Sequence, residues 1–207
     1  MQSEIIPKTL KTEGLPSSKA LVFIDLGNGF VKVLIRPHGS TKFERVSFPS
    51  YVAQTDESNS DCLRILQGQS LTTYKIGAGA ANTPQSHTGQ NETGKVSNAK
   101  LLLLHALRLA FGTGQNIHAD VIFTSPSNKA YGSDISAQLT GVHPVTIPAD
   151  VEVIGSEAKT FTAVVHRAVP MLEGHYAFSQ LKLKAEIRPI WGMAPTIAKS
   201  SHRLKVL

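Results

Sequence analysis

The 207-residue chain has little cysteine, few aromatic residues and no long apolar run. Its single cysteine, Cys62, excludes an internal disulfide and a cluster of thiolate metal ligands, and it fits a reducing compartment. The first residues, MQSEIIPKTLKTEG, lack the apolar segment of a signal peptide, and no apolar run approaches the length of a membrane span. The sequence therefore predicts a cytoplasmic protein with no membrane partner.

Excess positive charge is scarce outside the C-terminal segment, although the formal net charge of the chain is +6. Residues 181–207 contain six Lys and Arg residues and one Glu, so they supply +5 of that charge. The nearly neutral remainder argues against direct nucleic-acid binding by the body of the protein. The basic tail has one aromatic residue, Trp191, and no nucleic-acid motif. A non-enzymatic protein whose tail contacts nucleic acid or an acidic partner stays open as the alternative function.

What the sequence does contain is a compact motif in residues 21–32, LVFIDLGNGFVK, with the spacing D-x-G-x-x-x-x-K. Gly27 and Gly29 can adopt backbone angles closed to other residues and let a ligand approach the main chain. Successive N–H groups in such a turn suit polyphosphate. Asp25 could hold a hydrated Mg²⁺, and Lys32 would direct its charge to the same phosphates. The alternative is an ordinary hairpin with a Gly-Asn-Gly turn.

The pattern of apolar residues predicts an α/β fold with a mixed sheet, three leading antiparallel strands and flanking helices. We expect a flexible arm over 1–19, a domain over 20–177 with an inserted small subdomain over 49–96, and a poorly structured tail over 178–207. The expected strands cover residues 21–25, 30–36, 42–48, 63–66, 72–76, 119–124, 145–147 and 151–154. The expected helices cover 97–111, with Ser97 as N-cap and Gly112 as stop, 130–139, and a segment from Ser156 to just before Pro170.

Four segments, taken in order, resemble the first domain of the actin-like ATPases, which have a ribonuclease H-like fold, and especially the ParM-like plasmid-segregation actins. FIDLGNGFVK is similar to the phosphate-1 loop, and VSFPSYVA to the exit of the third strand. YKIGAGAAN followed by KLLLLHAL is similar to the middle of the domain, and VEVIGSEAKTF to the strand that delivers the catalytic carboxylate. The resemblance covers residues 20–170 and implies a mixed five-stranded sheet. It implies ATP and Mg²⁺ as cofactors, and filaments that segregate plasmid DNA, with a DNA-bound adaptor as possible partner. No motif of a sugar kinase, another member of the wider fold, is evident.

The resemblance also implies roles for individual residues. Asp25 would be catalytic and would organise Mg²⁺ through water, while Lys32 would contact the phosphates by charge. Glu157 would be the acid that orients the attacking water, a role that phosphoryl transfer requires. The nucleotide would be held by the turn formed by Gly27, Asn28, Gly29 and Phe30. Without the resemblance, Glu157 is better explained as an exposed acid in the first turn of a helix.

The second phosphate motif of that family, D-[IL]-G-x-G-T, is missing, as is the second domain that follows it. Residues 189–195, PIWGMAP, can be encoded by CCG ATC TGG GGA ATG GCA CC, and an offset frame of the same bases reads Asp-Leu-Gly-Asn-Gly-Thr. This compatibility leads to the hypothesis that the chain is a truncated or frameshifted product with the last part read out of frame. Because only one of the two phosphate motifs is present, we expect weak or absent ATP turnover.

Overall fold

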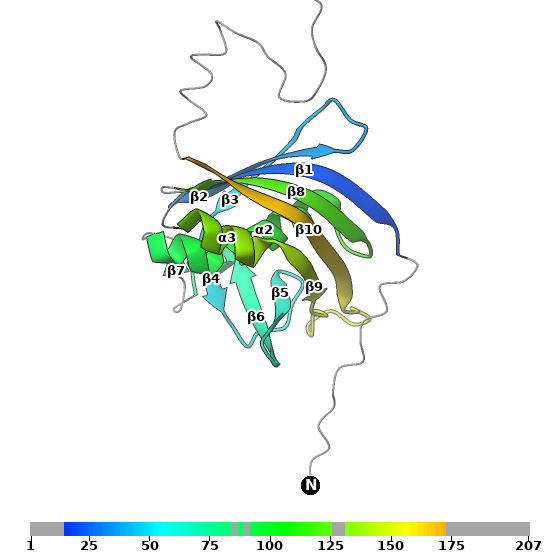
Figure 1. Ribbon diagram of the computed structural model, residues 1–207. Helices are drawn as coiled ribbons and strands as arrows, with labels where there is room; N and C mark the ends of the chain where they lie inside the picture. The colour runs from blue at the N-terminus through cyan, green and yellow to red at the C-terminus, as the bar shows by residue number, and fades with distance from the viewer. Residues whose placement is uncertain (1–14, 84–86, 89–91, 126–130, 173–207) are drawn as a thin grey trace, which may run out of the picture. The chain divides into compact units, whose positions relative to one another are not determined.

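The computed structural model describes residues 15–83, 87–88, 92–125 and 131–172 (Figure 1). The expected tail over 178–207 and most of the expected arm lie outside these residues. The first strand, β1 (Ser17–Leu26), begins three residues inside the stretch expected to be an arm. It alternates buried and more exposed side chains, as a strand with one face on the core does.

The three leading antiparallel strands are confirmed. β1 pairs with β2 (Phe30–Pro37), and β2 pairs with β3 (Glu44–Pro49), both antiparallel. The β2–β3 connection starts with a turn in which the amide of Ser40 donates to the carbonyl of Pro37 at 3.1 Å. Gly39 has a φ of 81° there, a value that favours glycine.

Two parallel neighbours complete the centre of the sheet. β8 (Asn116–Ser125) pairs in parallel with β1 on one side and with β10 (Lys159–Leu172) on the other, and β9 (Gly141–Ile147) runs antiparallel to β10. The carboxyl ends of β1, β8 and β10 therefore lie at one edge of the sheet. In α/β proteins this edge is where ligands bind.

The helix predicted from Ser156 to Pro170 is wrong, because these residues form the loop before β10 and most of β10 itself. Phe161, Ala163 and Val165 are buried at every second position, which is the period of a strand rather than of a helix. Pro170 is tolerated because β10 pairs with β9 only up to Val165 and is bonded to β8 alone beyond it.

The strand predicted over 151–154 is also wrong. The segment is an exposed loop in which the amide of Val153 donates to the carbonyl of Asp150 at 3.2 Å and the amide of Ser156 donates to the carbonyl of Val153 at 3.1 Å. Ser156 caps this loop rather than a helix, since its Oγ accepts from the amide of Asp150 at 2.8 Å.

The segment expected to be a separate insertion continues the same sheet. It forms β4 (Tyr51–Gln54), β5 (Cys62–Gln67), β6 (Ser70–Ile76), α1 (Ala78–Ala81) and β7 (His87–Thr88). Because β5 pairs with β9, the strand order is β3-β2-β1-β8-β10-β9-β5-β6-β4-β7, a sheet of ten strands rather than five. The α/β class is confirmed, and the strand count is corrected.

The long helix α2 (Glu92–Phe111) is the centre of the core. It packs against β1, β2 and β3 as well as β4 and β6, so the sheet curls around it (Figure 1). Residues 101–107 are all buried, which explains why the helix is apolar on every side. It starts five residues before Ser97, which is therefore not its N-cap, and it ends at Phe111, just before Gly112, whose φ is 75°. The short helix α3 (Ser133–Leu139) packs on β10 and α2.

Among the described residues, no helix is long and apolar enough to cross a membrane.

Candidate functional site

Asp25 lies at the carboxyl end of β1 and is oriented by the neighbouring strand. The hydroxyl of Thr124, on β8, donates to Oδ1 of Asp25 at 2.8 Å. The hydroxyl oxygen of Thr124 in turn accepts a hydrogen bond from the amide of Leu26 at 3.1 Å. Ile24 pairs with Phe123 in the parallel register just before these residues, so the register of β1 and β8 brings the threonine and the carboxylate together.

Lys32 lies directly across from Asp25 in the antiparallel register of β1 and β2. Paired residues share a face of a sheet. Their neighbours Ile24, Val31 and Val33 are buried in the core, so Asp25 and Lys32 are on the opposite face, where Lys32 is exposed. Among the described residues, Lys32 takes part in none of the ion pairs found. The two residues of the motif thus place a carboxylate and a free ammonium side by side.

The turn between Asp25 and Lys32 depends on Gly27 for a reason that differs from the expected one. Neither Gly27 nor Gly29 has a positive φ. A Cβ on Gly27 would instead lie 2.4 Å from the carbonyl oxygen of Phe30, which is too close for any side chain. A Cβ on Gly29 would meet no atom within 4 Å, so this glycine leaves open space beside the turn. Asn28 and Phe30 are exposed next to it.

Ser50 holds the turn from behind. It follows β3 and is almost fully buried, with 1% of its surface exposed. Its Oγ donates to the carbonyl of Asn28 at 2.6 Å, and its amide donates to the carbonyl of Gly29 at 3.1 Å. Both bonds take up carbonyl oxygens, which are the groups that would repel a phosphate. Ser50 therefore fixes the turn in a form compatible with an anion.

A buried histidine packs against β3, the strand that precedes Ser50. His105, in α2, makes an edge contact with the ring of Phe48 on β3, with ring centroids 4.7 Å apart. A Cβ added to Gly77 would lie 3.6 Å from Nε2 of His105. Burial, together with the nearby charge of Arg108, lowers the pKa of His105 from 6.5 to about 4. The side chain is therefore neutral in the folded protein near pH 7.

The structure does not bring Glu157 to this site. Glu157 is exposed in the loop before β10, whereas Asp25 lies beside the opposite end of that strand. Lys159 and Pro170, near the two ends of β10, are eleven positions apart, which is roughly 35 Å at the rise of a strand. Within the described fold, one nucleotide phosphate cannot contact both acids.

Thr124 and Ser50 are the site residues that the sequence analysis missed. A signal for Thr124 was present, because it is the polar residue that ends the apolar stretch ADVIFTS. The partner of Ser50 could not be read from the sequence, since it depends on the position of β3 relative to the turn.

The family model for the N-terminal domain of actin-like proteins matches residues 24–170, from the end of β1 nearly to the end of β10. The chain belongs to the actin-like protein family. The match includes Asp25 and Lys32, the turn between them, and Ser50 and Thr124. No curated protein matched the chain.

Solved structures share the fold of this actin-like domain at low sequence identity. The archaeal actin homologue Ta0583 superposes with a TM-score of 0.57 at 19% identity, covering 80% of this chain and 49% of that chain. A non-polymerisable quadruple mutant of pCBH ParM has a TM-score of 0.53 at 17% identity, covering 75% and 47%. A Bacillus thuringiensis ParM hybrid protein with ADP has a TM-score of 0.53 at 15% identity, covering 75% and 22%. The chain thus spans half or less of the length of these relatives.

Proposed function

We propose that the chain is the nucleotide-binding first domain of a ParM-type actin-like protein, which binds ATP with Mg²⁺ and assembles into filaments for plasmid or DNA segregation. The observation that carries the proposal is the turn after β1, held by Ser50 and placed between Asp25 and Lys32. Support comes from the relatives, since the ParM hybrid and one Ta0583 structure contain ADP, and the pCBH ParM variant is described as non-polymerisable.

The residues present fit a polyphosphate with a hydrated divalent ion. Asp25 offers a carboxylate that Thr124 orients, and Mg²⁺ binds through one or two carboxylates plus water and phosphate oxygens. Gly29 leaves room for a phosphate to approach the backbone, and Lys32 would add its charge. When bound, Mg²⁺ would neutralise charge on the phosphoryl oxygens. The work of this domain is to bind and orient the nucleotide.

The test of nucleotide binding is calorimetric titration of the 207-residue chain with Mg·ADP and Mg·ATP. We expect Asp25→Ala and Lys32→Ala each to weaken binding at least ten-fold. The matched control is Lys42→Ala, because Lys42 is an exposed lysine in the β2–β3 connection, at the far end of β2 from the turn. Equal affinities in the wild type, both site variants and the control would refute the proposed site.

We further propose that this chain by itself hydrolyses ATP weakly or not at all. Electrostatic stabilisation of a transition state is strong only in a closed and preorganised site, and the D-[IL]-G-x-G-T motif does not occur in this sequence. Steady ATP hydrolysis that Asp25→Ala abolishes would contradict this expectation. Sequencing the coding DNA from the Ser156 codon onward tests the frameshift hypothesis, which requires the offset frame to continue into a second domain.

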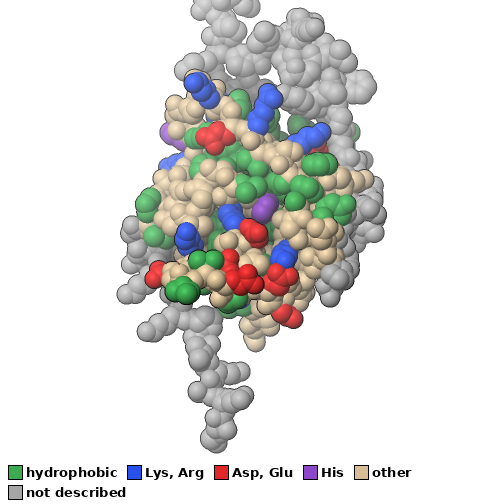
Figure 2. All heavy atoms as spheres, turned by 180° about the vertical axis from the view of Figure 1, so that it is seen from behind, with side chains coloured by type: hydrophobic (Ala, Val, Ile, Leu, Met, Phe, Trp, Pro, Cys, Tyr) green, Lys and Arg blue, Asp and Glu red, His purple; other side chains and the backbone are tan. Residues whose placement is uncertain are grey.

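Filament formation and DNA segregation are tested by sedimentation and electron microscopy with Mg·ATP, with and without plasmid DNA. The proposal places a DNA-bound adaptor, rather than the filament protein, in contact with DNA. On the face shown in Figure 2, basic side chains are spread among acidic and apolar ones, which fits the absence of direct DNA binding by that face. A cytoplasmic location, where Cys62 stays a free thiol, is part of the same proposal.

A further inference from the structure

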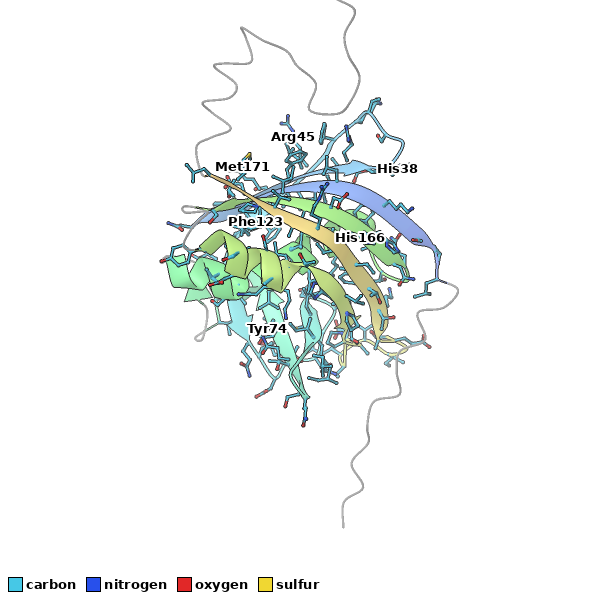
Figure 3. All side chains as sticks on the ribbon, viewed as in Figure 1. His38, Arg45, Tyr74, Phe123, His166 and Met171 are labelled. Carbon is cyan, nitrogen blue, oxygen red and sulfur yellow. The ribbon has the colours of Figure 1, made fainter. Side chains whose placement is uncertain are left out.

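Two histidines meet on the face of the sheet opposite the core. His118 is on β8, and His166 is near the middle of the neighbouring strand β10 (Figure 3). Nδ1 of His118 and Nε2 of His166 are 2.9 Å apart. The ring planes differ by 15°, and the centroids are 5.1 Å apart, so the rings meet edge to edge and not face to face. One of the two nitrogens must accept a hydrogen bond and therefore carries a lone pair.

A β-bulge creates this arrangement. His118 pairs with Val164, and the register of β8 and β10 shifts between Val165 and Arg167. The extra residue on β10 is His166, which is exposed. Bulges re-aim side chains in this way, and they are enriched near functional sites. In an unbroken register His166 would lie opposite Asp120, on the same face as His118 but two positions further along β8; the shift places Arg167 opposite Asp120 instead.

The charges around the pair are mixed. Asp120 follows His118 by two positions on the same face, and its carboxylate lies 3.8 Å from Nε of Arg167. Lys19 lies across from His118 on β1. Burial lowers the pKa of His118, and the charges of His166 and Lys19 lower it further. A neutral imidazole is the form that binds metal ions.

We propose that His118 and His166 form a binding site for a divalent transition metal ion, with Cu²⁺ and Ni²⁺ preferred. Imidazole nitrogens bind such ions at about 2.0–2.1 Å, so two of them in adjacent positions at a right angle are about 2.9 Å apart. The two nitrogens have this separation already. Each ring turns about its Cβ–Cγ bond so that the lone pair of this nitrogen faces the solvent side, where the ion binds. The proton of the donating nitrogen moves through water to the other nitrogen of the same ring, so both imidazoles bind the ion in their neutral form.

Two protein ligands make this a site of modest affinity, with water completing the coordination. No group of three or more His, Cys, Asp or Glu side chains suited to a metal is present in the described part of the chain. Lys19 and Arg167 oppose a cation, and Asp120 partly offsets them. Imidazole sites follow the order in which Cu²⁺ binds more tightly than Ni²⁺ and Zn²⁺. The ion would link β8 to β10 at the point where their register breaks, and it would stabilise the fold as its concentration rises.

The experiment is a titration of the untagged full chain with CuSO₄ and NiCl₂, followed by calorimetry, electron paramagnetic resonance of bound Cu²⁺ and thermal unfolding. The variants are His118→Asn and His166→Asn, and the matched control is His38→Asn, since His38 is an exposed histidine in the β2–β3 turn (Figure 3). We expect a signal of two nitrogen ligands, a rise in melting temperature with added ion, and at least a ten-fold loss of affinity in both site variants but not in the control.

Unchanged affinity in both site variants, or no binding to the wild type, would overturn the proposal. Melting curves without metal identify a variant that has failed to fold, and His166→Gln, at the exposed position of the bulge, then replaces it in the comparison. The site does not depend on the nucleotide site, so metal binding must also survive in Asp25→Ala.

Discussion

Replacement of His105 by leucine should reduce the loss of folding free energy that the protein undergoes as the pH falls. Leucine has a similar volume, favours helices and does not ionise. Nδ1 of His105 is buried without a hydrogen-bond partner among the described residues, so the change removes no bond found there. Replacing an unpaired buried polar group by an apolar one is close to neutral or stabilising. At neutral pH we therefore expect the variant to be at least as stable as the wild type.

The magnitude follows from the pKa of His105, which burial lowers from 6.5 to about 4. The folded pKa lies below the unfolded pKa, so the unfolded chain takes up the proton first as the pH falls. The wild type is unaffected above pH 6.5, loses stability between pH 6.5 and about 4, and loses no more below that range. A shift of this size corresponds to about 3 kcal/mol in the free energy of unfolding.

The assay is urea denaturation of the wild type and His105→Leu, followed by circular dichroism in steps between neutral pH and pH of about 4.5. The difference in free energy of unfolding between the two proteins should grow as the pH falls. Burial also lowers the pKa of His118 and His143, but these residues titrate in both proteins and cancel in the difference. His38→Asn controls for the loss of an exposed histidine. Parallel pH profiles for the wild type and His105→Leu would refute the reasoning.

Three further predictions concern the candidate site. Thr124→Val should lower the free energy of unfolding by about 1–3 kcal/mol in urea titrations, because it leaves the amide of Leu26 unpaired. Thr124→Ser, which keeps the hydroxyl, should lower the free energy of unfolding less, and equal stability of both variants would count against the assigned bonds. Gly27→Ala should destabilise the hairpin by about 1–3 kcal/mol through the clash with Phe30, whereas Gly29→Ala, in open space, should change thermal stability little. Glu157→Gln should leave nucleotide affinity unchanged in calorimetry, and a ten-fold loss would contradict its placement far from Asp25.

The hairpin after β1 shows how far sequence reasoning extends. Its strands, turn and paired charges depend on contacts within twelve consecutive residues, so the spacing of Asp25 and Lys32 was enough to predict them. The reason for glycine at position 27 was not predictable, because it depends on where the carbonyl of Phe30 lies after the turn closes. The partners Thr124 and Ser50 are 99 and 22 residues away in the sequence from the groups that they contact.

The segment that became β10 shows where sequence reasoning failed. The apolar residues between Ser156 and Pro170 are spaced as in a helix, but apolar residues also recur there at every second position, as in a strand. The decision between the two depends on hydrogen-bonding partners, and β8 and β9 supply these on both sides. Because the segment is a strand parallel to β8, its first residues lie at the end of the sheet opposite Asp25. Glu157, just before this strand, therefore lies at that end as well.

The sequence by itself determined the α/β class, the actin-like resemblance, the Gly-Asn-Gly turn between Asp25 and Lys32 and the long apolar helix α2, because each of these depends on local spacing and periodicity. The tertiary structure alone decided that β5 joins β9 to make one curled sheet, that Thr124 and Ser50 support the turn, that Glu157 is remote, and that His118 meets His166. These features depend on the register between strands distant in the chain, which the hydrophobic pattern of a single segment does not encode.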